Sequence, residues 1–142
     1  MNNPTATSPR KSPFTKVIIA AFVLGLAGLI IWNLPRGYSN DLTQIGSGTN
    51  IVVQVHDHDL VNSAGLMENL NKIRHEYKGV IEFVIADLKI AEGQAFATAH
   101  HVDAVTLVFF APDGSQLGTA QGVQDLDTLR NTLNQAFNLK QR

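Results

Sequence analysis

Residues 51–55 read IVVQV, an apolar run rich in β-branched residues that is typical of a buried strand. A second apolar run, residues 80–86, is interrupted only by Glu82. Between the two runs, apolar residues recur at steps of four, three and four, which predicts an amphipathic helix over 61–78 that ends at Gly79. Two strands joined through a helix pair in parallel with a right-handed crossover, so this region predicts an α/β domain.

The sequence that follows completes this layout within residues 51–142. Pro112-Asp113-Gly114 is a turn signature, because proline presets φ and glycine accepts left-handed backbone, and it predicts a hairpin. Apolar periodicity predicts the remaining elements: a helix near 92–101, strands over 105–110 and 117–120, and a helix over 125–138. We therefore expect a central mixed sheet with flanking helices.

A different kind of segment precedes this domain. Residues 17–34 are apolar apart from Asn33, and at about 1.5 Å per residue they would extend about 27 Å, close to the thickness of a bilayer core. We predict a single-pass transmembrane helix over 17–34, a disordered tail over 1–16, and a polar tether over 35–50 with at most a short strand at 42–45. A cleaved signal peptide is the alternative, but the apolar run is long and no clear small-residue cleavage site follows it.

The charges around this segment predict its orientation. Arg10, Lys11 and Lys16 precede it, whereas Arg36 is the only cation close behind it. The positive-inside rule then puts the N-terminus in the cytoplasm and the domain outside, in the periplasm if the cell is Gram-negative. The chain has a net charge of −1, which argues against nucleic acid as a partner.

Small residues lie along one face of the predicted membrane helix. Ala21, Gly25, Gly28 and Trp32 are spaced four, three and four apart, and small side chains let a second helix approach closely. This face indicates a membrane protein partner, although glycine and alanine are also simply common in such helices.

The chain contains no cysteine, which excludes disulfides, thiolate catalysis and cysteine metal sites. It also lacks the glycine-rich phosphate loops and the metalloprotease and serine-hydrolase motifs.

In its order of elements, the region over about 51–138 resembles the thioredoxin family. The resemblance is carried by the central strand Ile51–Val55, the helix end Glu76-Tyr77-Lys78-Gly79, the hairpin segments Thr106–Phe110 and Asp113-Gly114, and Gly122 before the last helix. It implies a thioredoxin-like fold with a redox site at the start of the helix that follows the central strand.

The residues that this redox chemistry needs are missing. Gap-free placement puts Leu60-Val61-Asn62-Ser63 where the family has its two cysteines. The buried acid of the family corresponds to Gln54, its tryptophan to Asp59, and its cis-proline to no proline, with Val105 nearest. Ser63 has no evident base near it in the sequence, so we expect the fold without the reaction.

Histidines and aspartates gather at the predicted end of the central strand. His56-Asp57-His58-Asp59 follow it, and in an extended chain the two histidines would point one way and the two aspartates the other. The resemblance implies that His100 and His101 approach the same rim, where the imidazoles could converge on a metal ion. The alternative is a solvated or recognition loop.

We therefore expect a non-catalytic, membrane-anchored interaction module without a cofactor, acting as a scaffold, assembly or accessory subunit of a membrane protein complex. An extracytoplasmic metal-binding protein that uses the His/Asp rim is the alternative. Residual enzyme activity is the third and weakest hypothesis.

Overall fold

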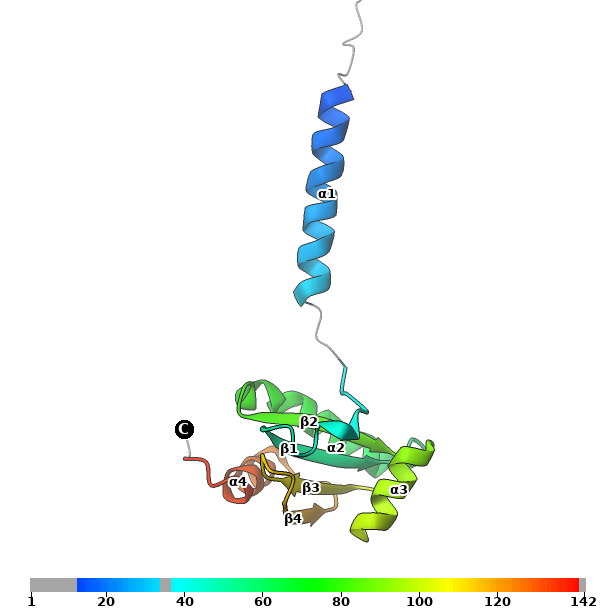
Figure 1. The fold of residues 1–142 in the computed structure, drawn as a ribbon, viewed down its shortest axis with the longest axis vertical. Coiled ribbons are helices and arrows are strands. Elements are labelled where there is room, and N and C mark those ends of the chain that lie inside the picture. Colours follow the sequence, from blue (N-terminus) through cyan, green and yellow to red (C-terminus); the bar gives the residue numbers. More distant parts are fainter. Residues whose placement is uncertain (1–12, 34–36, 141–142) are drawn as a thin grey trace, which may run out of the picture. The chain divides into compact units, whose positions relative to one another are not determined.

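The computed structural model describes residues 13–33 and 37–140, and the chain divides into two units, 1–37 and 38–142. The first unit contains helix α1 (Pro13–Asn33), drawn in blue in Figure 1. The tail predicted over 1–16 is thus wrong in its boundary, because the helix begins at Pro13. Residues 1–12 lie outside the described part of the chain.

The apolar side chains of α1 described between residues 16 and 29 are exposed, with Phe22 at 72% and Leu24 at 73%. Within the described residues, no helix combines the length and the apolar content needed to cross a bilayer. The span predicted over 17–34 also includes Leu34, which is not described, and it stays a prediction. On the small-residue face, Ala21, Gly25 and Gly28 are exposed, and the side chain of Trp32 is not described.

The second unit is a mixed α/β domain. Its sheet has the order β2-β1-β3-β4, made of β1 (Asn50–His56), β2 (Ile81–Asp87), β3 (Thr106–Phe110) and β4 (Gln116–Gln121). β1 runs parallel to β2 and antiparallel to β3, which forms an antiparallel hairpin with β4 (Figure 1). The predicted parallel pair, hairpin and mixed sheet are confirmed.

Helices follow β1, β2 and β4 at the predicted places. They are α2 (Val61–Ile73), which continues as the 3₁₀ helix η2 (Arg74–Tyr77), α3 (Ala91–His100) and α4 (Leu126–Ala136). Gly79 adopts φ +81°, a backbone conformation that suits glycine and lets the chain leave the helix towards β2.

The sheet buries side chains on both faces, because successive residues of a strand point to opposite sides. Val52 and Leu107 join the core formed with Leu66 and Leu70 of α2 and with α4. On the other face, the core contains Ile51, Val53, Val55, Val108, Phe110 and Phe96 of α3.

The segment before β1 differs from the predicted tether. Ser39 forms a bridge to Val84 of β2, and the Ile85 N–H donates a 2.9 Å hydrogen bond to the Ser39 carbonyl. The side chains of Leu42 and Ile45 pack against the α3 side of the core. The short strand predicted at 42–45 is wrong, because Asp41 caps the Thr43 N–H and starts a 3₁₀ turn, η1 (Leu42–Gln44).

Candidate functional site

A buried histidine–serine pair spans the turn between β1 and α2. His56 is the last residue of β1, Ser63 lies in the first turn of α2, and their exposed fractions are 4% and 0%. The Ser63 hydroxyl lies 2.9 Å from His56 Nδ1 and accepts a 3.0 Å hydrogen bond from the Asp57 N–H. With its oxygen accepting from Asp57, the hydroxyl can donate its proton to the ring nitrogen of a neutral His56.

Gln54 extends this polar group into the core. Its side-chain amide donates a 2.9 Å hydrogen bond to the Ser63 carbonyl, and only 1% of the residue is exposed. The other polar atom of its side chain, Oε1, is buried without a hydrogen-bond partner among the described residues. Gln54 therefore ties the middle of β1 to the start of α2 without supplying a titratable group.

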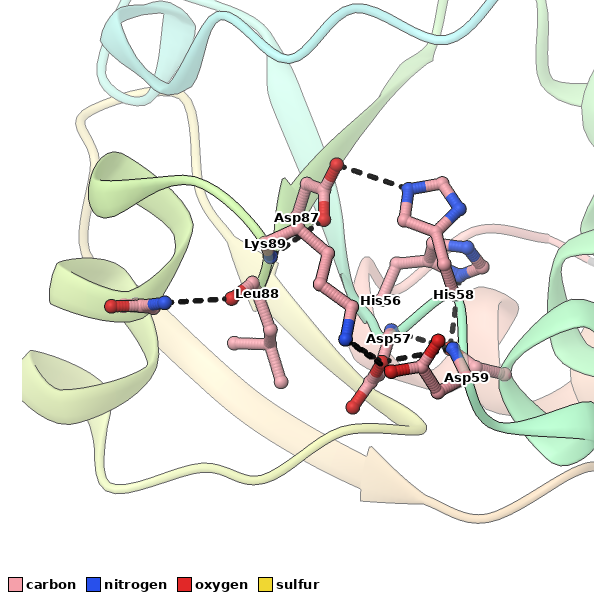
Figure 2. A network of polar contacts seen from close by, with 9 residues as sticks. His56, Asp57, His58, Asp59, Asp87, Leu88 and Lys89 are labelled. Atoms are coloured by element: carbon pink, nitrogen blue, oxygen red, sulfur yellow. Dashed lines mark hydrogen bonds and ion pairs between the residues drawn. The ribbon is translucent and has the colours of Figure 1, made fainter.

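His58 lies beside His56 and pairs with the end of β2. The two imidazole rings meet edge to face with centroids 4.6 Å apart, and His58 Nε2 lies 3.0 Å from Asp87 Oδ2 (Figure 2). Burial and the neighbouring His58 lower the pKa of His56. The Lys89 backbone N–H, and then His58, hold the pKa of Asp87 below its usual range.

The two aspartates of the loop face a lysine instead. Lys89 Nζ lies 3.4 Å from Asp57 Oδ1 and also contacts the Asp59 carboxylate (Figure 2). Asp57 in turn accepts a 3.0 Å hydrogen bond from the Asp59 N–H, which is the main reason that its pKa is lowered. The loop after β1 thus contacts the loop after β2 through one charged cluster.

The four residues 60–63, which the sequence resemblance aligns with a redox motif, lie at the start of α2. Leu60 is the N-cap residue and makes no side-chain cap, so the first turn is not closed by a polar side chain. Leu60 is 43% exposed, Val61 is 86% exposed and Asn62 is exposed, whereas Ser63 is buried. This corner of the domain therefore presents aliphatic surface next to the polar group of His56 and Ser63.

Val105 lies directly before β3 with an unusual backbone. Its φ of +62° lies in the left-handed region, which is costly for a β-branched residue. The Val105 N–H donates to the Val55 carbonyl at 3.0 Å, and the Val105 carbonyl accepts from the Gly122 N–H at 2.8 Å. These two bonds fix the strained residue between β1 and the end of β4.

The four imidazoles, which the resemblance allowed to converge on one rim, do not form one cluster among the described residues. His100, at the end of α3, lies 2.8 Å from Gln116 through Nδ1 and packs on Phe96 and Phe110. Phe110 is opposite Ile51 at the start of β1, whereas His56 is at its end. The physical reason is that α3 runs back along the sheet, so the His100 ring lies near the start of β1 and not near its end. His101 is exposed.

No group of three or more His, Asp or Glu side chains is arranged to hold a metal ion among residues 13–33 and 37–140. His58 and Asp87 contact each other, and the aspartates of the loop contact Lys89, so these side chains are engaged with one another in the described structure.

Sequence reasoning missed the base beside Ser63. His56 and Ser63 are seven residues apart, and only the tight turn between β1 and α2 brings their side chains together. The sequence did contain an indication of this contact. A histidine at the end of a buried strand and a serine in the first turn of the next helix can come within hydrogen-bond distance of each other. Ser63 has no exposed surface, and in this structure the pair joins the end of β1 to the start of α2.

No protein-family model and no curated protein matches this chain.

Proposed function

We propose that the chain is a non-catalytic, membrane-anchored, thioredoxin-like interaction module that serves as a scaffold, assembly or accessory subunit of a membrane protein complex. The sheet order and the helix that joins its parallel strands support the thioredoxin-like part. The exposed apolar side chains of α1 support the anchor. In this proposal the N-terminus is cytoplasmic and the domain is extracytoplasmic.

The observation that carries the proposal is the identity and exposure of the residues between β1 and α2. Where thioredoxin-like enzymes hold two thiols, this chain has exposed Leu60 and a buried Ser63 whose hydroxyl contacts the Asp57 N–H and His56. Neither side chain can exchange electrons with a substrate. Leu60 and the adjacent Val61 instead offer aliphatic surface of the kind that protein contacts bury.

A photoreactive side chain at Val61 of the full chain, in its native membrane, tests this contact. We expect covalent linkage to a discrete membrane protein. The matched control carries the same probe at Val80, which is 43% exposed in the loop before β2. Equal yields from both positions, or no product from Val61, would refute an interaction site at this corner.

The anchor and its orientation can be tested separately, because the chain has no cysteine of its own. Asn3→Cys and Gln135→Cys variants are treated with a membrane-impermeant maleimide in cells whose outer envelope is permeable to it. We expect only the Gln135→Cys variant to react until detergent is added. The opposite labelling, or release of the chain by an alkaline wash, would refute this topology.

A further inference from the structure

β4 is an edge of the sheet with no neighbour beyond it among the described strands. In the order β2-β1-β3-β4, the opposite edge is partly covered by Ser39, which bridges to Val84 of β2. Native edge strands are normally protected by charged residues, proline or a covering segment. The sequence from Gly114 to Gln124 contains no charged residue and no proline, so β4 lacks the first two protections.

The hydrogen bonds show which backbone groups of β4 are directed away from β3. Thr106 is opposite Gln121, and the Gly122 N–H donates to the Val105 carbonyl at 2.8 Å. In an antiparallel ladder, hydrogen-bonded and non-hydrogen-bonded pairs alternate. The N–H and C=O groups of Thr119 and Gln121 therefore point outward, where another strand can bond to them.

The sequence around this edge is nearly symmetric about Ala120. Residues 116–124 read QLGTAQGVQ, so polar residues, glycines, aliphatic residues and glutamines occur in the same order in both directions from Ala120. The two aliphatic members, Leu117 and Val123, are 48% and 47% exposed. When two identical strands pair antiparallel about a two-fold axis at Ala120, each residue lies opposite the residue that is equally far from Ala120 on the other side.

We infer that β4 pairs with β4 of a second copy of the chain, antiparallel and about a two-fold axis at Ala120. Thr119 of each copy is then opposite Gln121 of the other, with their outward backbone groups exchanging hydrogen bonds. The nearest acidic residues, Asp113 and Asp125, lie beyond the paired segment, so no like charges oppose each other within it.

The absence of native cysteine allows a direct test on the full chain in its membrane. In the inferred register, Ala120 is opposite its own copy in a non-hydrogen-bonded pair, where the Cα atoms lie about 4.5 Å apart. That separation is within the disulfide range of about 4.4–6.8 Å. We expect Ala120→Cys to form a covalent dimer under a mild oxidant, and Ala95→Cys, on the exposed face of α3, to remain monomeric.

Charge variants separate this interface from any contact made through α1. Adding Thr119→Glu and Gln121→Glu to the Ala120→Cys chain places glutamates opposite each other, and we expect loss of the covalent dimer. Co-expression with a Thr119→Lys/Gln121→Lys/Ala120→Cys chain should restore it as a heterodimer. An unchanged thermal unfolding midpoint shows that each variant is folded.

Two results would overturn the inference. One is an Ala120→Cys yield no higher than that of Ala95→Cys, a comparison that does not depend on the charge variants. The other is a covalent dimer that persists undiminished in the folded glutamate variant.

Discussion

Helices α2 and α3 start in equivalent places but are docked to the sheet in different ways. Each follows a parallel strand, β1 or β2, and each begins after an apolar N-cap residue, Leu60 or Ile90, that makes no side-chain cap. The first turn of α2 is held by side-chain hydrogen bonds through Ser63. The first turn of α3 lies so close to β2 that a Cβ atom on Gly93 would be 2.0 Å from the Asp87 carbonyl oxygen.

The difference separates a docking that we expect to respond to pH from one that depends on the close fit of two backbones. At α2, a histidine whose pKa is lowered by burial takes part in the contact, so we expect the attachment to depend on protonation. At α3, the backbone of the helix at Gly93 packs directly against the backbone of Asp87. Only glycine, which has no Cβ atom, allows this close approach.

The largest expected effect is at Gly93. Gly93→Ala would place a methyl group 2.0 Å from the Asp87 oxygen and 2.5 Å from its carbon, so the helix must move away from β2. We expect a loss of about 2–4 kcal/mol in the free energy of unfolding, measured by urea denaturation.

The matched control is Gly65→Ala in α2, where the nearest atom to an added Cβ is a Val123 methyl at 3.9 Å. This variant should be unchanged or more stable by about 0.5–1 kcal/mol, because alanine favours a helix over glycine. Equal destabilisation by the two substitutions would contradict the distinction between the helices.

The next effect is at the docking of α2. Ser63→Ala removes the hydroxyl and leaves the Asp57 N–H and His56 Nδ1 without their partner in a buried place. We expect a loss of about 1–3 kcal/mol in the free energy of unfolding. Asn62→Ala, at the exposed neighbouring position, serves as the control. A neutral result for Ser63→Ala would show that the polar group adds no net stability.

The pair also predicts how stability depends on pH. Burial and His58 lower the pKa of His56, so the unfolded chain takes up a proton at higher pH than the folded chain does. This contribution is present at neutral pH and is lost as the pH falls through about 6.5 towards the lower folded value. The carboxylates of Asp57 and Asp87, whose pKa values are also lowered, act in a more acidic range.

Urea midpoints at pH 7.5 and pH 5.5 measure this effect. The His56→Asn variant should lose less stability between the two pH values than the parent chain. His75→Asn, at an exposed position in η2, should keep the parental slope. If removal of His56 leaves the slope unchanged, the protonation-dependent docking of α2 is refuted.

These contrasts also explain what could be predicted from sequence. The strands were predictable because IVVQV and the runs at 80–86 and 105–110 are apolar over a strand's length, and the turn at Pro112-Asp113-Gly114 fixes the hairpin. The crossover helix followed from its spacing of apolar residues.

The missed features depend on tertiary contact. The segment over 38–50 looks like a polar linker, yet Tyr38, Leu42 and Ile45 pack onto the two cores. The direction in which α3 packs along the sheet determines where His100 lies, and the local sequence does not predict that direction. The hydrogen bond between His56 and Ser63 depends on a turn geometry that residue type alone does not specify.

The smallest expected effect concerns the charged cluster that joins the two loops before α2 and α3. Lys89 Nζ contacts Asp57 and Asp59, but the lysine and Asp59 side chains are 47% and 77% exposed, so solvent and salt weaken the attraction. Lys89→Met should therefore leave the urea midpoint close to that of the parent chain, with any difference disappearing at high salt. Lys72→Met, which removes an exposed pair with Glu68 within α2, is the matched control. A loss as large as that of Ser63→Ala would mean that the loops, rather than the buried Ser63–His56 contact, hold α2 in place.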